Sequence, residues 1–129
     1  MRVRKILETC IYVDDLNAAE QFYQDVLGLK LVSRQDNRHV FLQCEDQMLL
    51  IFNPQESIDD GDLPPHGTTG AGHLAFGVPE DELDAWKTRL TSKLITIERK
   101  IDWPGGGRSM ALTLVFLLVI RLRFLLVVS

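Results

Sequence analysis

The chain has 129 residues, a length that fits one domain or two small repeats that share a core. Hydrophobic residues make up 46% and charged residues 25%, which is typical of a soluble globular protein. The net charge of -4 leaves no basic footprint, so nucleic acid is not expected as a partner. Cys10 and Cys44 lie in apolar runs and are predicted to be buried thiols of a reducing cytoplasm. The N-terminus also lacks the apolar stretch of a signal peptide.

The first predicted strand runs from Ile6 to Val13, and Asp14 or Asp15 can cap the helix that follows. Apolar residues then recur at spacings of three, four and seven, and Gly28 ends this helix. The helical face consists of Leu16, Ala19, Phe22, Tyr23, Val26 and Leu27.

Three short strands are predicted next, over residues 30–33, 39–43 and 48–52, with polar turns between them. They complete a β-α-β-β-β unit over about residues 6–53. Residues 54–71 are rich in Pro, Gly and Asp and have no periodicity. We interpret them as a linker between two repeats or as a flap over a site.

A second unit is predicted over about residues 72–129. It has a strand over 73–78, a helix over 79–90 and a strand over 94–98. Leu83, Trp86 and Leu90 form the predicted buried stripe of this helix. The glycine-rich segment 103–107 is interpreted as a flexible turn and not as a phosphate-binding loop, because it does not open a helix.

The repeat places two potential metal ligands at equivalent points. Glu8 stands five residues before Val13, and His73 stands five residues before Val78. Because side chains alternate between the faces of a strand, the equal offset puts both residues at the same point of equivalent strands. They can converge if the units pack around a pseudo-twofold axis. The alternative is that both are merely polar residues at strand ends.

The tail from residue 111 to residue 129 is atypical. The second unit needs two more strands with a turn between them, but no Gly, Pro, Asn or Asp interrupts this apolar segment. A membrane anchor is one interpretation, and Arg121 and Arg123 argue against it because a central charge disfavours insertion. Exposed, such a segment would be prone to aggregation.

A third interpretation concerns the gene. A DNA sequence can be written that encodes residues 117–123 in one reading frame. In the frame that starts one nucleotide earlier, the same DNA encodes Pro-Ala-Gly-Asn-Ser-Leu-Glu. That text contains the missing turn and ends in a carboxylate. We hypothesise a reading-frame slip near Met110. A gene sequence without this second frame would contradict it.

Several segments together resemble the vicinal oxygen chelate superfamily, which includes glyoxalases, bleomycin resistance proteins and extradiol dioxygenases. The matching text is Tyr12-Val-Asp-Asp-Leu16, Phe22-Tyr23 with Asp25-Val-Leu-Gly-Leu29, and Gly72-His-Leu-Ala-Phe-Gly-Val78, and the resemblance covers about residues 6–110. It implies an α+β fold of two β-α-β-β-β modules that form a cupped mixed sheet around a divalent metal. It also implies a homodimer, which would complete the exposed sheet edges.

The resemblance further implies a set of site residues. Glu8 takes the ligand position of the first strand, and His73 takes the one that opens the second module. Leu50 falls roughly where glyoxalases supply a further Glu, and Arg123 holds the place of the last ligand, so two of three ligands of a dioxygenase-type site are retained. Mn, Fe, Ni or Zn would suit this site. Glu8 could alternatively act as a general base.

Two functions follow from the resemblance. The first is a divalent-metal-dependent lyase, isomerase or dioxygenase that acts on a small molecule with vicinal oxygens. The second is a metal-free protein that binds or sequesters a small molecule, as bleomycin resistance proteins do. The missing third carboxylate favours the second function, and the restored frame favours the first, so enzymatic activity stays open. The substrate cannot be predicted from the fold alone.

Other polar and aromatic residues have weaker signals. Arg108, which follows the triple glycine, could bind an anionic substrate or could be a plain surface charge. His39 is expected to be at the surface or half-buried, and His66 is expected to be exposed in the long loop. The larger aromatic residues are expected in the core and not at a ligand: Phe22, Tyr23, Phe76 and Trp86.

Overall fold

The computed structural model of the chain describes residues 1–58, 67–68, 72–102, 108–116 and 120–128. Within these ranges, the side chains of residues 72–73, 98–99, 101–102, 108–116 and 120–128 are not described. The chain divides into two compact units. One comprises Met1–Thr69 with Phe116–Ile120, and the other comprises Gly70–Val115 with Arg121–Ser129.

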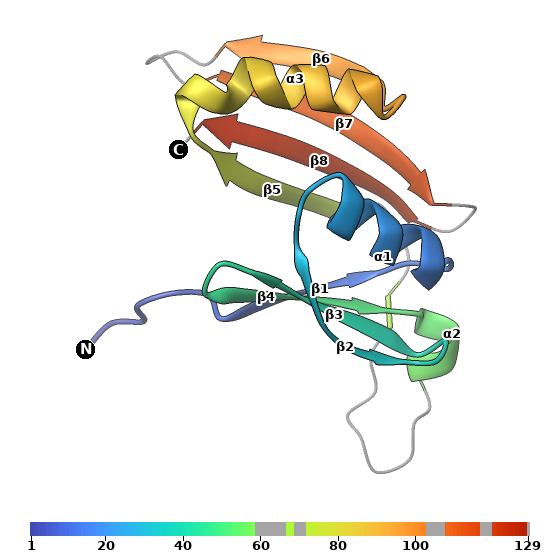
Figure 1. Cartoon of the computed structure of the whole chain (residues 1–129). Helices are drawn as coiled ribbons and strands as arrows, with labels where there is room; N and C mark the ends of the chain where they lie inside the picture. The colour runs from blue at the N-terminus through green and yellow to red at the C-terminus, as the bar shows by residue number, and fades with distance from the viewer. Residues whose placement is uncertain (59–66, 69–71, 103–107, 117–119, 129) are drawn as a thin grey trace. The chain divides into compact units, whose positions relative to one another are not determined.

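The first unit is a four-stranded mixed sheet with one long helix (Figure 1). The strand order is β1-β4-β3-β2, in which β1 and β4 are parallel and the other neighbours are antiparallel. In chain order the elements are β1 (Glu8–Tyr12), α1 (Leu16–Asp25), β2 (Lys30–Gln35), β3 (His39–Cys44), β4 (Gln47–Phe52) and α2 (Pro54–Ser57).

Helix α1 begins and ends with the residues that the sequence indicates. The side chain of Asp15 accepts a hydrogen bond from the backbone N–H of Ala18 at 2.9 Å, so Asp15 and not Asp14 is the N-cap. Gly28 follows the helix with a φ of 76°, a conformation that glycine adopts without strain. The predicted apolar face packs on the sheet, with Ala19 and Tyr23 fully buried.

The second unit repeats this plan. Its elements are β5 (Gly72–Val78), the 3₁₀ turn η1 (Glu80–Glu82), α3 (Leu83–Ser92), β6 (Ile97–Asp102), β7 (Arg108–Phe116) and β8 (Ile120–Val128). The strand order is β5-β8-β7-β6, with β5 parallel to β8 and β6 antiparallel to β7.

The repeat extends to local irregularities. The register of β2 shifts between Leu31 and Ser33, and the register of β6 shifts between Ile97 and Arg99, at the same point of each unit. The predicted α+β fold of two β-α-β-β-β modules is therefore confirmed.

Two predictions for the second unit differ from the structure. The strand expected from residue 94 begins at Ile97, because Leu94 has a φ of 58° and lies in the turn that ends α3. The backbone N–H of Ile95 still bonds to the carbonyl of Leu90 in that turn. Trp86 is half-buried, whereas Leu83 and Leu90 are buried as expected.

The apolar tail forms strands β7 and β8, not the helix that a membrane anchor would need. Among the described residues, no helix has the length and apolar character required to cross a membrane. The expected turn at 103–107 and the loop residue His66 lie outside the described residues.

Candidate functional site

Glu8 is the first residue of β1, and its side chain is exposed. The parallel register with β4 places Glu8 beside Met48, Cys10 beside Leu50 and Tyr12 beside Phe52. Alternation along the strand puts Glu8, Cys10 and Tyr12 on one face of the sheet. Ile11 and its cross-strand partner Ile51 are on the opposite face, which α1 covers.

His73 has an equivalent backbone position in the second unit. It is the second residue of β5, and the parallel register with β8 places it beside Arg123. Glu8 stands in the same relation to Met48 at the corresponding point of the β1 and β4 pair. The register therefore identifies Met48 as the residue of the first unit that is equivalent to Arg123 in the second unit. Met48 lies two residues before Leu50.

The residues at these four positions fit a divalent metal only in part. A carboxylate and an imidazole are ordinary ligands of Mn, Fe, Ni and Zn, so Glu8 and His73 are suitable donors. Arg123 holds the third position, and a guanidinium offers no lone pair to a metal and opposes its charge. Among the side chains that the structure describes, no group of three His, Cys, Asp or Glu could hold a metal ion. The donor set is thus incomplete.

The roles of the three expected site residues stay predictions. Glu8 belongs to the first unit and His73 to the second, so their convergence on one ion is a prediction. Arg108 is the first residue of β7, and its side chain lies outside the described part. Its role as a substrate-binding residue stays a prediction too.

Cys10 is half-buried on the same face as Glu8. Burial raises the pKa of the Cys10 thiol, and the negative charge of Glu8 raises it further. Burial, followed by the charge of Glu45, likewise raises the pKa of Cys44. Both thiols are therefore protonated near neutral pH, which argues against a nucleophilic role for either.

A buried pair of basic residues at the start of β3 was not predicted. Arg38 and His39 have only 9% and 8% of their surface exposed, so the expectation that His39 is at the surface or half-buried is wrong. The guanidinium Nη1 of Arg38 lies 2.9 Å from Nδ1 of His39. Because a guanidinium can only donate, Nδ1 is the acceptor and the imidazole is neutral, with its proton on Nε2.

The sequence signal for this pair is slight. His39 lies opposite Phe52 in the antiparallel register of β3 with β4, and the Arg38 guanidinium lies 5.5 Å from the centre of the Phe52 ring. Only the pairing of the two strands brings these residues together, and the segment around His39 shows no pattern that demands it.

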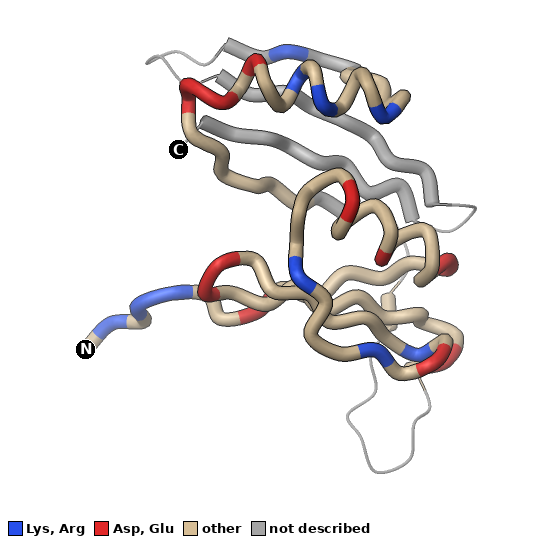
Figure 2. Tube along the Cα trace, in the orientation of Figure 1, with Lys and Arg blue, Asp and Glu red and all other residues tan. Residues whose placement is uncertain are grey.

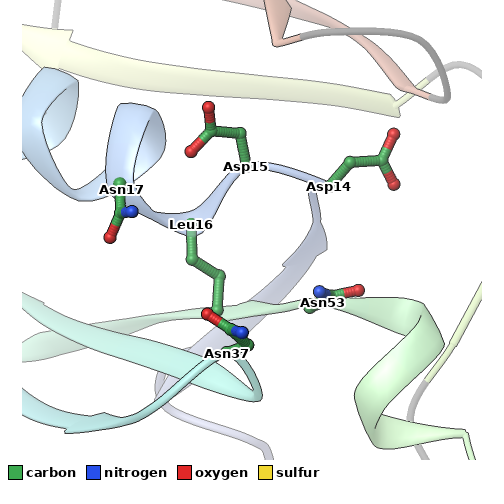
Figure 3. A pocket seen from close by; sticks show the side chains of 6 residues that line it. All are labelled: Asp14, Asp15, Leu16, Asn17, Asn37 and Asn53. Atoms are coloured by element: carbon green, nitrogen blue, oxygen red, sulfur yellow. The ribbon is translucent and has the colours of Figure 1, made fainter.

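A polar pocket of about 400 Å³ lies where β1 leads into α1 (Figure 3). Three of the side chains that line it already serve the fold. Asp15 caps α1, Asn53 accepts from the backbone N–H of Gln55 at 3.0 Å, and Asn17 accepts from Arg34 at 2.6 Å. The pocket therefore lies beside the N-caps of α1 and α2, and, among the described residues, Oδ1 of Asp14 in its lining is buried without a hydrogen-bond partner. Its lining residues are Asp14, Asp15, Leu16, Asn17, Asn37 and Asn53.

Positive side chains cluster in the N-terminal segment before β1 (Figure 2). Lys5 forms an exposed ion pair with Asp46 at 2.7 Å, which lowers the pKa of the Asp46 carboxyl. Exposed pairs of this kind add little to stability.

Comparisons with known proteins agree with this architecture. Residues 5–116 match the family described as the Glyoxalase/Bleomycin resistance protein/Dioxygenase superfamily. Glyoxalase 1 of Caenorhabditis elegans is 30% identical in an alignment over 108 residues that covers 78% of this chain and 35% of that protein. The chain therefore spans about a third of the length of that relative.

Solved structures extend the likeness. A lactoylglutathione lyase from Agrobacterium tumefaciens is 38% identical, with a TM-score of 0.84 and 96% coverage of both chains. A glyoxalase/bleomycin resistance protein/dioxygenase from Nocardioides has a TM-score of 0.70, at 20% identity, over 98% of this chain and 86% of that one. The second likeness concerns the fold alone. The chain belongs to the Glyoxalase/Bleomycin resistance protein/Dioxygenase superfamily.

Proposed function

We propose that this chain is a divalent-metal-dependent enzyme of the lyase class that acts on a small molecule with two neighbouring oxygen atoms. The observation that carries the proposal is the 38% identity with a lactoylglutathione lyase over 96% of both chains. Lactoylglutathione is a thioester whose carbonyl oxygen has a hydroxyl group on the next carbon. It fits the expected class of substrate and is the first compound to test.

Glu8 and His73 are the proposed metal ligands, because they stand at equivalent points of the repeated strands. A bound divalent ion would supply Lewis-acid polarisation of the two substrate oxygens. Glu8 is also the proposed general base, since its exposed carboxylate can accept a proton from a bound substrate. Arg108 is proposed to bind an anionic part of the substrate.

A metal-free binding protein is the second candidate, and Arg123 is the observation that favours it. Its position beside His73 replaces a metal-binding group with a fixed positive charge. Such a protein would hold the same kind of small molecule without converting it. The two candidates differ in their metal content and in turnover.

The test is to purify the protein, confirm its intact mass and measure its bound metal after exposure to Mn, Fe, Ni or Zn. The first candidate predicts close to one divalent ion per chain and metal-dependent conversion of lactoylglutathione. It also predicts that Glu8→Gln and His73→Asn each reduce metal retention, whereas Glu45→Gln, an exposed carboxylate elsewhere, does not. Unchanged retention in the two ligand variants would overturn the ligand assignment.

Absence of metal uptake together with tight binding of a small molecule would establish the second candidate. A homodimer in the cytoplasm is part of either proposal. Light scattering on the purified protein measures the mass in solution and would show a monomer if the dimer were wrong.

A further inference from the structure

A polar bridge links the helix of the first unit to the last strand of its sheet. Arg34 of β2 forms an ion pair with Glu20 of α1 and donates a hydrogen bond to the side chain of Asn17 at 2.6 Å. The side chains of Arg34 and Glu20 are mostly covered, with 28% and 19% of their surface exposed. The strand β2 is the edge of this sheet, so the bridge fastens the edge to the helix with one cation and one anion.

The repeat identifies the same bridge positions in the second unit, where β6 is the edge strand. Arg34 and Lys100 are each the second residue that pairs after the register shift of their strand. Glu20 and Lys87 are each the fifth residue of their helix. The second unit therefore has a lysine at both ends of the bridge, and two cations replace the ion pair of the first unit.

The two lysines contact each other. The side chain of Lys100 shares a hydrogen bond with that of Lys87, and this contact, followed by the charge of Lys87, lowers the pKa of Lys100. Asp84, which stands in α3 where Asn17 stands in α1, acts in the opposite direction and offsets this effect only in part. Both lysines are exposed, and Figure 2 shows the basic segments of α3 and β6 next to each other.

Such a pair is unfavourable without a counter-ion. An ammonium group only donates, so two lysines can share a hydrogen bond only when one amine has lost its proton. Like charges in contact disfavour the protonated form of both amines. An anion between them would give each amine a charged acceptor and would allow both to be protonated.

We propose that Lys87 and Lys100 form a binding site for a phosphate group, either free phosphate or the phosphomonoester of a small metabolite. A phosphate group carries close to two negative charges at neutral pH and several acceptor oxygens, so it matches two ammonium groups. A carboxylate would balance only one of them. The anion would take the bridging position that Glu20 has in the first unit. The site needs neither a metal nor the proposed metal ligands, so it does not depend on the proposed function.

The test titrates metal-free protein with sodium phosphate and, separately, with glycerol phosphate. Two-dimensional NMR spectra follow the backbone amides of α3 and β6. We expect the amides of Lys87 and Lys100 to shift with a dissociation constant on the order of 1 mM. A glycerol phosphate affinity at least about tenfold higher would identify a phosphomonoester as the ligand, and equal affinities would identify free phosphate. No shift, or the same shift in sodium chloride of equal ionic strength, would overturn the site.

Variants locate the binding on the two lysines. Lys87→Gln and Lys100→Gln should each weaken phosphate binding at least about fivefold, because each removes a charged donor. Lys93→Gln removes an exposed charge at the end of α3 and is the matched control, with an expected change below about 1.5-fold. Asp84→Asn removes a carboxylate that repels the anion and should strengthen binding about twofold. Equal losses in all three lysine variants would show a general charge effect and would refute the assignment.

Stability provides a second measurement. A ligand that binds only the folded state raises the urea midpoint, and about 10 mM phosphate should do so for the wild-type protein relative to chloride of equal ionic strength. Lys87→Glu restores the charge pattern of the first unit. This variant should be at least as stable as wild type in chloride and should gain nothing from phosphate. A phosphate gain that persists in Lys87→Glu would mean that the anion binds elsewhere and would contradict the proposal.

Discussion

His73 lies directly beside Arg123 in the parallel pair that β5 forms with β8. Two residues in this relation occupy one row of a sheet, so position 123 is where a second ligand would support His73. An arginine there repels a divalent cation and cannot coordinate it. The identity of residue 123, in the apolar tail, therefore bears on which of the two proposed functions is right, a metal-dependent enzyme or a metal-free binding protein.

The first prediction is that Arg123→Glu increases the affinity for Zn by at least about tenfold. The change removes a positive charge from the neighbourhood of His73 and supplies a carboxylate ligand. Calorimetric titration of the metal-free protein measures the affinity. Arg121→Glu makes the same change in net charge one row away and is expected to have a much smaller effect. Equal gains in the two variants would show a general charge effect and no ligand at position 123.

The second prediction concerns the gene. The family match ends at residue 116, before β8 begins at Ile120, and the hypothesised slip lies upstream of β8. Sequencing across codons 105–129 of the source gene is expected to reveal a frame that reads Gly-Asn-Ser-Leu-Glu. The glutamate of that frame would fall at position 123. A sequence that confirms the apolar text without this frame would contradict the hypothesis of a reading-frame slip.

The local order of elements follows from the sequence because caps, turns and apolar periodicity act over a few residues. The boundaries of the elements in the first unit follow almost to the residue from Asp15, Gly28 and the polar turns between strands. The strand predicted from Leu94 begins later because the end of α3 bends the backbone there, although the apolar neighbours of Leu94 alternate as in a strand. Propensity cannot reveal a positive φ at a leucine.

The candidate site was less predictable than the fold. Equivalent offsets identified Glu8 and His73, but their convergence depends on how the two units pack, which is a tertiary property. The burial of Arg38 and His39 arises from Phe52, which is 13 residues further along the chain from His39. Strand register likewise brings Tyr12 and Phe41 onto the face of Glu8.

The third prediction tests the electrostatic contact between Glu8 and Cys10. Burial is the larger cause of the raised pKa of Cys10, and the charge of Glu8 is the second. Glu8→Gln removes that charge, so the pKa falls and more thiolate is present at a given pH. Alkylation of Cys10 by iodoacetamide at about pH 8.5 should become roughly twofold faster. Mass spectrometry of the labelled peptides measures the rate.

Cys44 provides the internal control for this experiment. Its pKa is raised by burial and by Glu45, so its labelling rate should not change in Glu8→Gln. Glu45→Gln should accelerate Cys44 and leave Cys10 unchanged. Parallel changes at both thiols in one variant would indicate a loosened fold and would contradict the local charge effect.

The fourth prediction concerns the buried arginine. Arg38→Ala removes the donor to Nδ1 of His39 and the cation above the Phe52 ring. The free energy of unfolding should fall by about 2 kcal/mol, because a buried polar atom loses its charged partner. Arg34→Ala is the control. Its contacts with Glu20 and Asn17 are partly exposed, so its cost should be about 0–1 kcal/mol. Urea unfolding measures both, and equal costs would contradict the role of Arg38.

The last prediction isolates backbone strain at the end of α1. Gly28 has a φ of 76°, and a Cβ added there would meet no atom within 4 Å. Gly28→Ala therefore introduces strain without a steric clash, and we expect it to lower the free energy of unfolding by about 1 kcal/mol. Gly28→Asn should cost less, because asparagine tolerates the left-handed region better than alanine. Urea midpoints at an unchanged slope measure both variants, and an alanine variant as stable as wild type would show that the chain leaves this conformation in solution.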